Sequence, residues 1–172
     1  LDRGAPNRFG DGVIPVWSPD GRRIASQMAG PKIIAKSVAA SGETETLATG
    51  SGGTMSPLDW AADGRLLFSA LAAKGRSLWV VPSSGDRTAR LYLEATGGAG
   101  IASAAFSPDG RWIAFASSEL GPTEIFITPS DRGAGRQRVS TGGGGQPRWG
   151  RNGSELYYLS SGRTVMAASI AT

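Results

Sequence analysis

The stretch FSPDGRWIAF, residues 106–115, decides the fold of this chain because it has the form of a β-hairpin. Pro108 presets the backbone angle at the second position of a turn, and Asp109 and Gly110 accept the conformations that follow it. Hydrophobic residues stand on both sides of the turn, as they do in two paired strands. The stretch therefore predicts a hairpin. If the same hairpin recurs along the chain, it indicates a fold built from repeats.

The same hairpin recurs at nearly even spacing. Its four copies begin at aromatic residues that are 43, 46 and 43 residues apart: Trp17, Trp60, Phe106 and Trp149. Asp-Gly follows the first three aromatics at one common distance, and Asn-Gly follows the fourth. An aliphatic residue then comes at a common offset, as Ile24, Leu67, Ile113 and Leu156. A period of this length indicates a repeat architecture.

Each copy of the hairpin is part of a unit with several short strands. The third copy reads as the strands ASAAFS, WIAFASS, EIFITPS and RQRVST, separated by turn residues. No segment has a sustained helical period, so the chain is predicted to be all-β. A four-stranded antiparallel unit of this length is typical of a β-propeller blade. We predict one propeller domain over residues 1–172, with repeats at about 11–53, 54–98, 99–145 and 146–172.

The fourth repeat is shorter than the others and supplies three strands, PRWG, ELYYLS and TVMAASI. An N-terminal strand from residues 1–10 would complete this blade, close the ring and remove an exposed sheet edge. A homodimer that forms one eight-bladed ring, or a piece of a larger ring, agrees with the repeat count equally well. Because the chain does not begin with Met, we expect a fragment or a processed product.

Composition restricts the chemistry that is open to the chain. It has no His and no Cys, so it can form neither a Ser-His-Asp triad, nor a Cys-His pair, nor an imidazole or thiolate zinc site. We therefore expect a protein that is not an enzyme, without metal or cofactor. The net charge of +4 comes from scattered arginines, which favours a solvated surface over a nucleic-acid site. No apolar run is long enough for membrane insertion.

Three repeated features have a structural and a functional interpretation. The Asp-Gly turns could suggest calcium, but one carboxylate per blade does not gather ligands at one point, and Asn152 fits only a turn role. The aromatic that opens each hairpin is interpreted as a wedge between blades rather than a stacking platform for a ligand. The glycine run 142–145 precedes a strand, so it is a connection between blades rather than a phosphate loop.

Candidate binding residues lie in or just before the innermost strands, where they face the central channel or its mouth. They differ from repeat to repeat, and a scaffold builds a specific site at such positions. Trp112 begins a strand outside the register of the repeated aromatics and is a further ligand candidate. The candidates for binding a ligand or partner are Pro15, Asp59, Ser103, Arg148 and Trp112.

The segments PVWSPDGRRIAS, FSPDGRWIAFASSELGPTEIFI and RQRVSTGGGGQPRWGRNGSELYYLSSGRTVMAASI resemble the TolB-like β-propeller repeats of bacteria. The resemblance covers the whole chain and is strongest to propeller segments at the C-terminus of bacterial Ser/Thr protein kinases. Related repeats occur in the periplasmic translocation protein of the Tol system and in propellers that gate prolyl-oligopeptidase-like peptidases. The turns WAADG and WGRNG depart from the family pattern but keep the glycine.

The resemblance implies a non-catalytic scaffold or sensor module of a larger bacterial regulatory or envelope protein. We expect a protein or peptide partner at the channel mouth, and an extracytoplasmic location in the periplasm or at the cell surface. One alternative is the substrate-gating propeller of a peptidase whose catalytic domain lies outside this chain. Another is a propeller fragment that assembles with itself.

Overall fold

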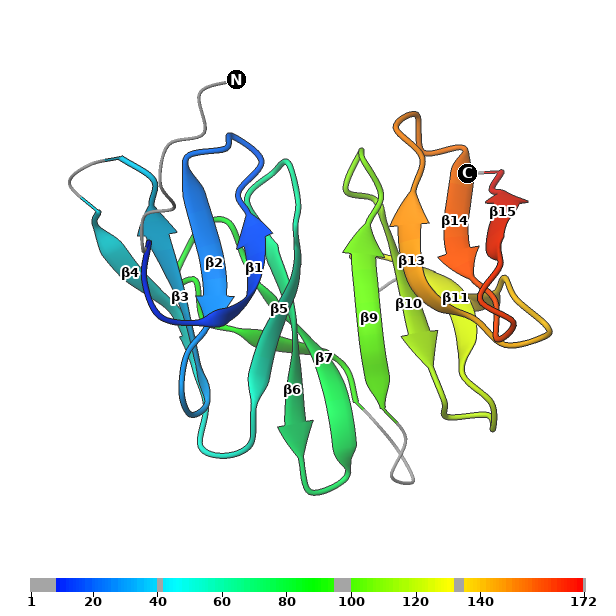
Figure 1. Cartoon of the computed structure of the whole chain (residues 1–172), viewed down its shortest axis with the longest axis horizontal. Helices are drawn as coiled ribbons and strands as arrows, with labels where there is room; N and C mark the ends of the chain where they lie inside the picture. The colour runs from blue at the N-terminus through cyan, green and yellow to red at the C-terminus, as the bar shows by residue number, and fades with distance from the viewer. Residues whose placement is uncertain (1–8, 40–41, 95–99, 132–134, 172) are drawn as a thin grey trace.

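The computed structural model describes residues 9–39, 42–94, 100–131 and 135–171, which form fifteen strands and no helix (Figure 1). The strands make four antiparallel sheets, which we call blades 1 to 4. Blade 1 contains β1 (Val13–Trp17), β2 (Arg23–Gln27), β3 (Lys32–Ser37) and β4 (Thr44–Thr49). Blade 2 contains β5 (Met55–Trp60), β6 (Leu66–Ala72), β7 (Gly75–Val81) and β8 (Arg90–Leu93).

Blade 3 contains β9 (Ile101–Phe106), β10 (Trp112–Ser117), β11 (Glu124–Pro129) and β12 (Gln137–Arg138), and blade 4 contains β13 (Gly145–Trp149), β14 (Glu155–Leu159) and β15 (Val165–Ser169). In every blade the strands pair in chain order. The innermost strands β1, β5, β9 and β13 contact one another in sequence, so the blades form an arc around one axis (Figure 1). The prediction of an all-β propeller with four repeated blades is confirmed.

The Ser-Pro-Asp-Gly hairpins are held by their own side chains. In blade 3 the Ser107 hydroxyl accepts the amide N–H of Trp112 at 2.9 Å and donates to Asp109 Oδ1 at 2.5 Å. Asp109 Oδ1 also accepts the amide N–H of Arg111 at 3.0 Å. The Asn152 side chain plays the same part, accepting the amide N–H of Ser154 at 3.2 Å. The predicted turn role of the Asp and Asn residues is confirmed.

The hairpin of blade 2 differs from the prediction by one residue. Trp60 pairs with Leu66, whereas Phe106 pairs with Ile113, so Leu66 and not Leu67 occupies the common aliphatic position. The turn is shorter because Ala61, which stands where the other turns have Ser or Gly, closes it by donating its amide N–H to the Arg65 carbonyl at 2.9 Å.

The core lies between the blades. In blades 2 to 4 the aromatic residue of the inner strand faces the preceding blade, and Trp60 and Phe106 are each only 6% exposed. Trp149 is half-buried, and its Nε1 donates to the Ala105 carbonyl of blade 3 at 3.2 Å. The wedge interpretation is confirmed for these residues. It is wrong for Trp17, which is 58% exposed because no other blade within the described residues covers its face of blade 1.

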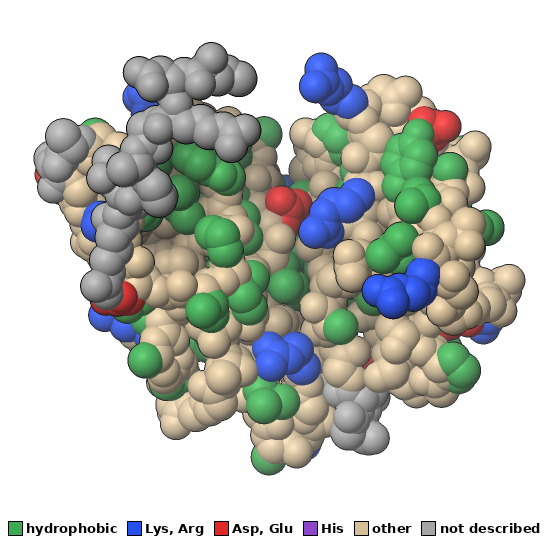
Figure 2. All heavy atoms as spheres, in the orientation of Figure 1, with side chains coloured by type: hydrophobic (Ala, Val, Ile, Leu, Met, Phe, Trp, Pro, Cys, Tyr) green, Lys and Arg blue, Asp and Glu red, His purple; other side chains and the backbone are tan. Residues whose placement is uncertain are grey.

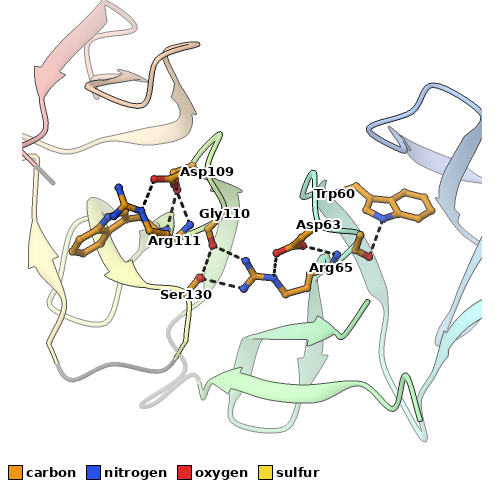
Figure 3. A network of polar contacts seen from close by, with 10 residues as sticks. Trp60, Asp63, Arg65, Asp109, Gly110, Arg111 and Ser130 are labelled. Atoms are coloured by element: carbon orange, nitrogen blue, oxygen red, sulfur yellow. Dashed lines mark hydrogen bonds and ion pairs between the residues drawn. The ribbon is translucent and has the colours of Figure 1, made fainter. Parts of the chain in front are cut away.

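Arg65 links blade 2 to blade 3 (Figure 3). Its Nη2 donates to the Gly110 carbonyl at 2.5 Å and its Nη1 donates to the Ser130 hydroxyl at 3.1 Å. Its Nε pairs with Asp63 of the same turn at 2.7 Å, which orients the side chain toward blade 3. The guanidinium also lies 4.8 Å from the centre of the Phe106 ring, a cation–π contact. One side chain thus joins two neighbouring hairpins.

The N-terminal segment was predicted to complete blade 4. Residues 1–8 lie outside the described residues, so that strand stays a prediction. Phe9, which is described, lies against blade 1: the Lys36 ammonium is 4.9 Å from the centre of its ring and donates to its carbonyl. No helix in the described part of the chain has the length and apolar character that spanning a membrane requires.

Candidate binding site at the inner strands

A cavity of about 390 Å³ lies where the inner strands of all four blades come together. Figure 2 shows acidic and basic side chains facing each other across the furrow between blades 1 and 2 on one side and blades 3 and 4 on the other. The cavity is lined by Pro15, Val16, Leu58, Asp59, Ala105, Phe106, Pro108, Arg148 and Trp149. It is therefore a property of the arc, to which every blade contributes.

Four of these residues occupy equivalent positions in the four blades, each directly before the aromatic residue that opens the hairpin: Val16, Asp59, Ala105 and Arg148. The scaffold thus presents an aliphatic, an acidic, a small and a basic side chain at equivalent points. Proline explains part of this geometry, since β1, β5 and β13 each contain one and proline has no N–H for the ladder. All three strands are bulged just before the aromatic, and bulges re-aim side chains.

Asp59 is the acidic group of the cavity and is partly buried. Its Oδ2 accepts the amide N–H of Phe106 at 2.7 Å, and its Oδ1 accepts the amide N–H of Trp60 at 2.9 Å. Burial raises the pKa of the Asp59 carboxyl above its usual value, while these two amide donors and the charge of Arg148 act in the opposite direction. The carboxylate therefore ties β5 to β9 and presents negative charge beside the cavity.

Arg148 is the basic group and is exposed. Its Nη1 donates to the Pro147 carbonyl at 2.8 Å, which orients the guanidinium. Because a guanidinium carries five N–H donors, this bond leaves the group able to bind a ligand carbonyl or carboxylate. With Asp59 it forms a polar pair between apolar walls from Pro15, Phe106 and Trp149. Such a set can hold a polypeptide segment by its polar groups and its side chains together.

The structure brings three of the predicted site residues together and leaves two apart. Pro15, Asp59 and Arg148 line the same cavity. Ser103 lies further along β9, where its hydroxyl accepts the amide N–H of Gln146 at 3.1 Å and so joins blade 3 to blade 4. Trp112 begins β10 beside the hairpin and is half-buried, away from the residues that line the cavity.

Sequence reasoning did not assign several lining residues to the site, and it interpreted two of them, Phe106 and Trp149, as wedges between blades. Phe106 and Trp149 do pack between blades, yet both also border the cavity. Val16 and Ala105 carry no chemistry of their own and become visible only through their register with Asp59 and Arg148. The signal that finds them is the position directly before the repeated aromatic.

Comparison with known proteins agrees with this architecture. The model of a family described as TolB beta propeller domain matches residues 12–172. No curated protein matches the chain at a significant level.

Three solved structures show the same fold at low sequence identity. TolB from Acinetobacter baumannii is 20% identical, with a TM-score of 0.74 over 90% of this chain. A puromycin-hydrolyzing peptidase from Mycobacterium tuberculosis is 15% identical, with a TM-score of 0.70 over 92% of it. The Cps50 (Swd1) propeller domain from Myceliophteria thermophila is 15% identical, with a TM-score of 0.65 over 91% of it. The chain spans 39%, 27% and 50% of these three proteins, respectively.

Proposed function

Since this chain belongs to the TolB beta propeller domain family, we propose that it is a non-catalytic module that binds a protein or peptide segment at the convergence of its inner strands. The observation that carries this proposal is the placement of Asp59 and Arg148 in one cavity with Pro15, Phe106 and Trp149. An acidic and a basic group between apolar walls match the mixed polar and apolar character of a peptide. The module belongs in the extracytoplasmic part of a larger bacterial regulatory or envelope protein.

The proposal is tested by selection from a random library of 12-residue peptides displayed on phage, with the immobilised chain as bait. Enriched sequences are synthesised with a fluorescent label and titrated by anisotropy. We expect Arg148→Gln to weaken binding at least about tenfold, the size of an interface hot spot. Arg151→Gln is the matched control, because Arg151 is exposed in the blade 4 turn and does not line the cavity. Peptides that bind Arg148→Gln as tightly as the unaltered chain would refute the proposal.

A second candidate function is self-association through the two end faces of the arc. Val165 of blade 4 has the register of Leu78 in blade 2, since each pairs with the residue three positions after the common aliphatic residue, yet Val165 is 67% exposed and Leu78 is fully buried. Trp17 is likewise 58% exposed, where Trp60 and Phe106 are buried. Apolar residues at both ends thus lack the cover that the same positions have inside the arc.

Light scattering coupled to size exclusion tests this second candidate. Self-association predicts a mass of twice the 17.7 kDa of one chain, with a return to the single mass in Trp17→Ser. A single-chain mass at every concentration up to about 100 μM, where specific dimers form, would exclude it.

A further inference from the structure

The cavity at the inner strands contains one acidic and one basic side chain. Among the described residues that line it, Asp59 and Arg148 are the charged ones, and the others are aliphatic, aromatic or proline. Because the two charges are opposite, a ligand group with a single charge is attracted by one of them and repelled by the other. The cavity therefore favours an uncharged group that can both donate and accept hydrogen bonds.

The two charged side chains do not form an ion pair with each other in the described structure. Arg148 Nη1 donates to the Pro147 carbonyl at 2.8 Å. Asp59 accepts the amide N–H groups of Phe106 at 2.7 Å and of Trp60 at 2.9 Å. Burial raises the pKa of the Asp59 carboxyl, and the charge of Arg148 acts to lower it, so the two groups influence each other through the space between them.

Both side chains retain hydrogen-bonding capacity toward the cavity. A carboxylate has about four lone-pair positions, of which Asp59 uses two for the amides, and a guanidinium has five N–H donors, of which Arg148 uses one for Pro147. These bonds also fix both groups in position before a ligand arrives, which lowers the entropic cost of binding. Acidic and basic side chains face each other across this furrow in Figure 2.

A primary carboxamide matches this pair of groups. Its NH₂ group donates to a carboxylate, its carbonyl oxygen accepts from a guanidinium, and it has no charge. A ligand carboxylate at the same place is repelled by Asp59, and a ligand ammonium is repelled by Arg148. The planar amide and its methylene stem pack against the apolar walls from Pro15, Phe106 and Trp149.

We propose that the cavity at the inner strands recognises the carboxamide side chain of a glutamine or asparagine in the bound peptide. The carboxamide N–H donates to the Asp59 carboxylate, and the carboxamide oxygen accepts from the Arg148 guanidinium. A site built to hydrogen-bond a polar group rejects analogues that lack this group, so the pair makes the cavity selective. This inference rests on the proposed peptide binding and names the residue type that the site reads.

The probes are the N-acetyl amides of glutamine, asparagine, glutamate, lysine and methionine, which share one backbone and differ in the side chain. Each is titrated into ¹⁵N-labelled chain, and the backbone amide signals of Asp59 and Arg148 are followed. We expect saturable shifts with the glutamine or the asparagine probe at about 10 mM, and binding of the other three that is weaker by at least about tenfold. The tighter of the two carboxamides identifies the residue. The proposal is wrong if neither carboxamide shifts these signals, or if the glutamate, lysine or methionine probe binds as tightly.

A charge reversal assigns the selectivity to the pair. Arg148→Glu places two acids in the cavity, so this variant should bind the lysine probe at least about tenfold more tightly than the glutamine probe. Arg148 is exposed, so the circular dichroism spectrum should be unchanged. Arg151→Gln, which lies outside the cavity lining, should keep the order of the unaltered chain. An unchanged preference for carboxamides in Arg148→Glu overturns the proposed recognition.

Replacing each glutamine and asparagine of a selected peptide by methionine separates this inference from the proposed function. One of these replacements should weaken binding at least about tenfold. If the peptide requires Arg148 but tolerates methionine at every such position, the peptide site stands and carboxamide recognition is wrong. If no peptide is selected and the probes still bind in the expected order, the carboxamide site stands and the proposed peptide binding is wrong.

Discussion

Replacing Arg65 by alanine should destabilise the chain because it removes the contacts that join blade 2 to blade 3. The lost hydrogen bonds run to the Gly110 carbonyl at 2.5 Å and the Ser130 hydroxyl at 3.1 Å, and hydrogen bonds to charged groups are worth about 1.5–3 kcal/mol each. The cation–π contact with Phe106, at 4.8 Å, adds about 0.5–1 kcal/mol.

The full sum overstates the effect of Arg65→Ala for two reasons. The Arg65 side chain is 22% exposed, so water replaces part of what is lost, and the Ser130 hydroxyl still donates to Gly110 at 2.5 Å. We expect the free energy of unfolding to fall by about 2–4 kcal/mol, measured by urea titration with circular dichroism. Arg65→Lys should recover less than half of the loss, because an ammonium lacks the planar fork that reaches both acceptors.

The repeat supplies a matched control for this experiment. Arg111 follows its Asp-Gly pair at the same offset as Arg65, but its side chain is 69% exposed and pairs with Asp109 of its own turn. Arg111→Ala should therefore lower the free energy of unfolding by less than about 0.5 kcal/mol. If Arg65→Ala and Arg111→Ala destabilise the chain equally, the reasoning that Arg65 joins the blades is refuted.

Carboxyl titration by NMR should give opposite shifts at two aspartates. Hydrogen bonds from the Ser107 hydroxyl and from Arg111 hold the pKa of Asp109 at about 2, so its stabilising effect is present above pH 4 and is lost as the pH falls toward 2. Burial raises the pKa of the Asp59 carboxyl, so the contribution of Asp59 to the free energy of unfolding is present below pH 4 and is lost as the pH rises through its pKa in the folded state. Equal pKa values for Asp59 and Asp109 would contradict both assignments. Leu78→Ala should lower the free energy of unfolding by about 2–5 kcal/mol and Val165→Ala by less than about 0.5 kcal/mol, since only Leu78 is covered by a neighbouring blade. Similar losses for the two variants in urea titration would show that the end face of blade 4 is covered. Ser107→Ala should lower that free energy by about 1 kcal/mol through loss of the turn's hydroxyl, and no change would show that the backbone alone holds the turn.

The hairpins could be predicted from sequence because their information is local. Pro108, Asp109 and Gly110 specify a turn whatever surrounds them, and the even spacing of four such turns then indicates blades. The shorter turn of blade 2 could not be predicted because Gly64 stands at the same distance from the aromatic residue as in the other repeats. The backbone hydrogen bond that closes the turn nevertheless ends one residue earlier, at Arg65.

Burial and assembly depend on neighbours that a repeat does not specify. Trp17 has the same motif as Trp60, yet one is exposed and the other buried, because burial depends on which blade lies opposite. Pro15, Asp59 and Arg148 converge because three bulged strands aim them at one point, whereas Ser103, on the same kind of strand, points to a neighbouring blade.

Chemical-shift mapping of a selected peptide on the ¹⁵N-labelled chain tests most directly whether binding occurs at the inner strands. Peptide binding at the cavity predicts that the largest shifts fall on the amides of Val16, Asp59, Ala105 and Arg148, in four blades at one register. Shifts confined to β4 and β8, or to the end faces around Trp17 and Val165, would contradict the proposal that the four inner strands together form the binding site.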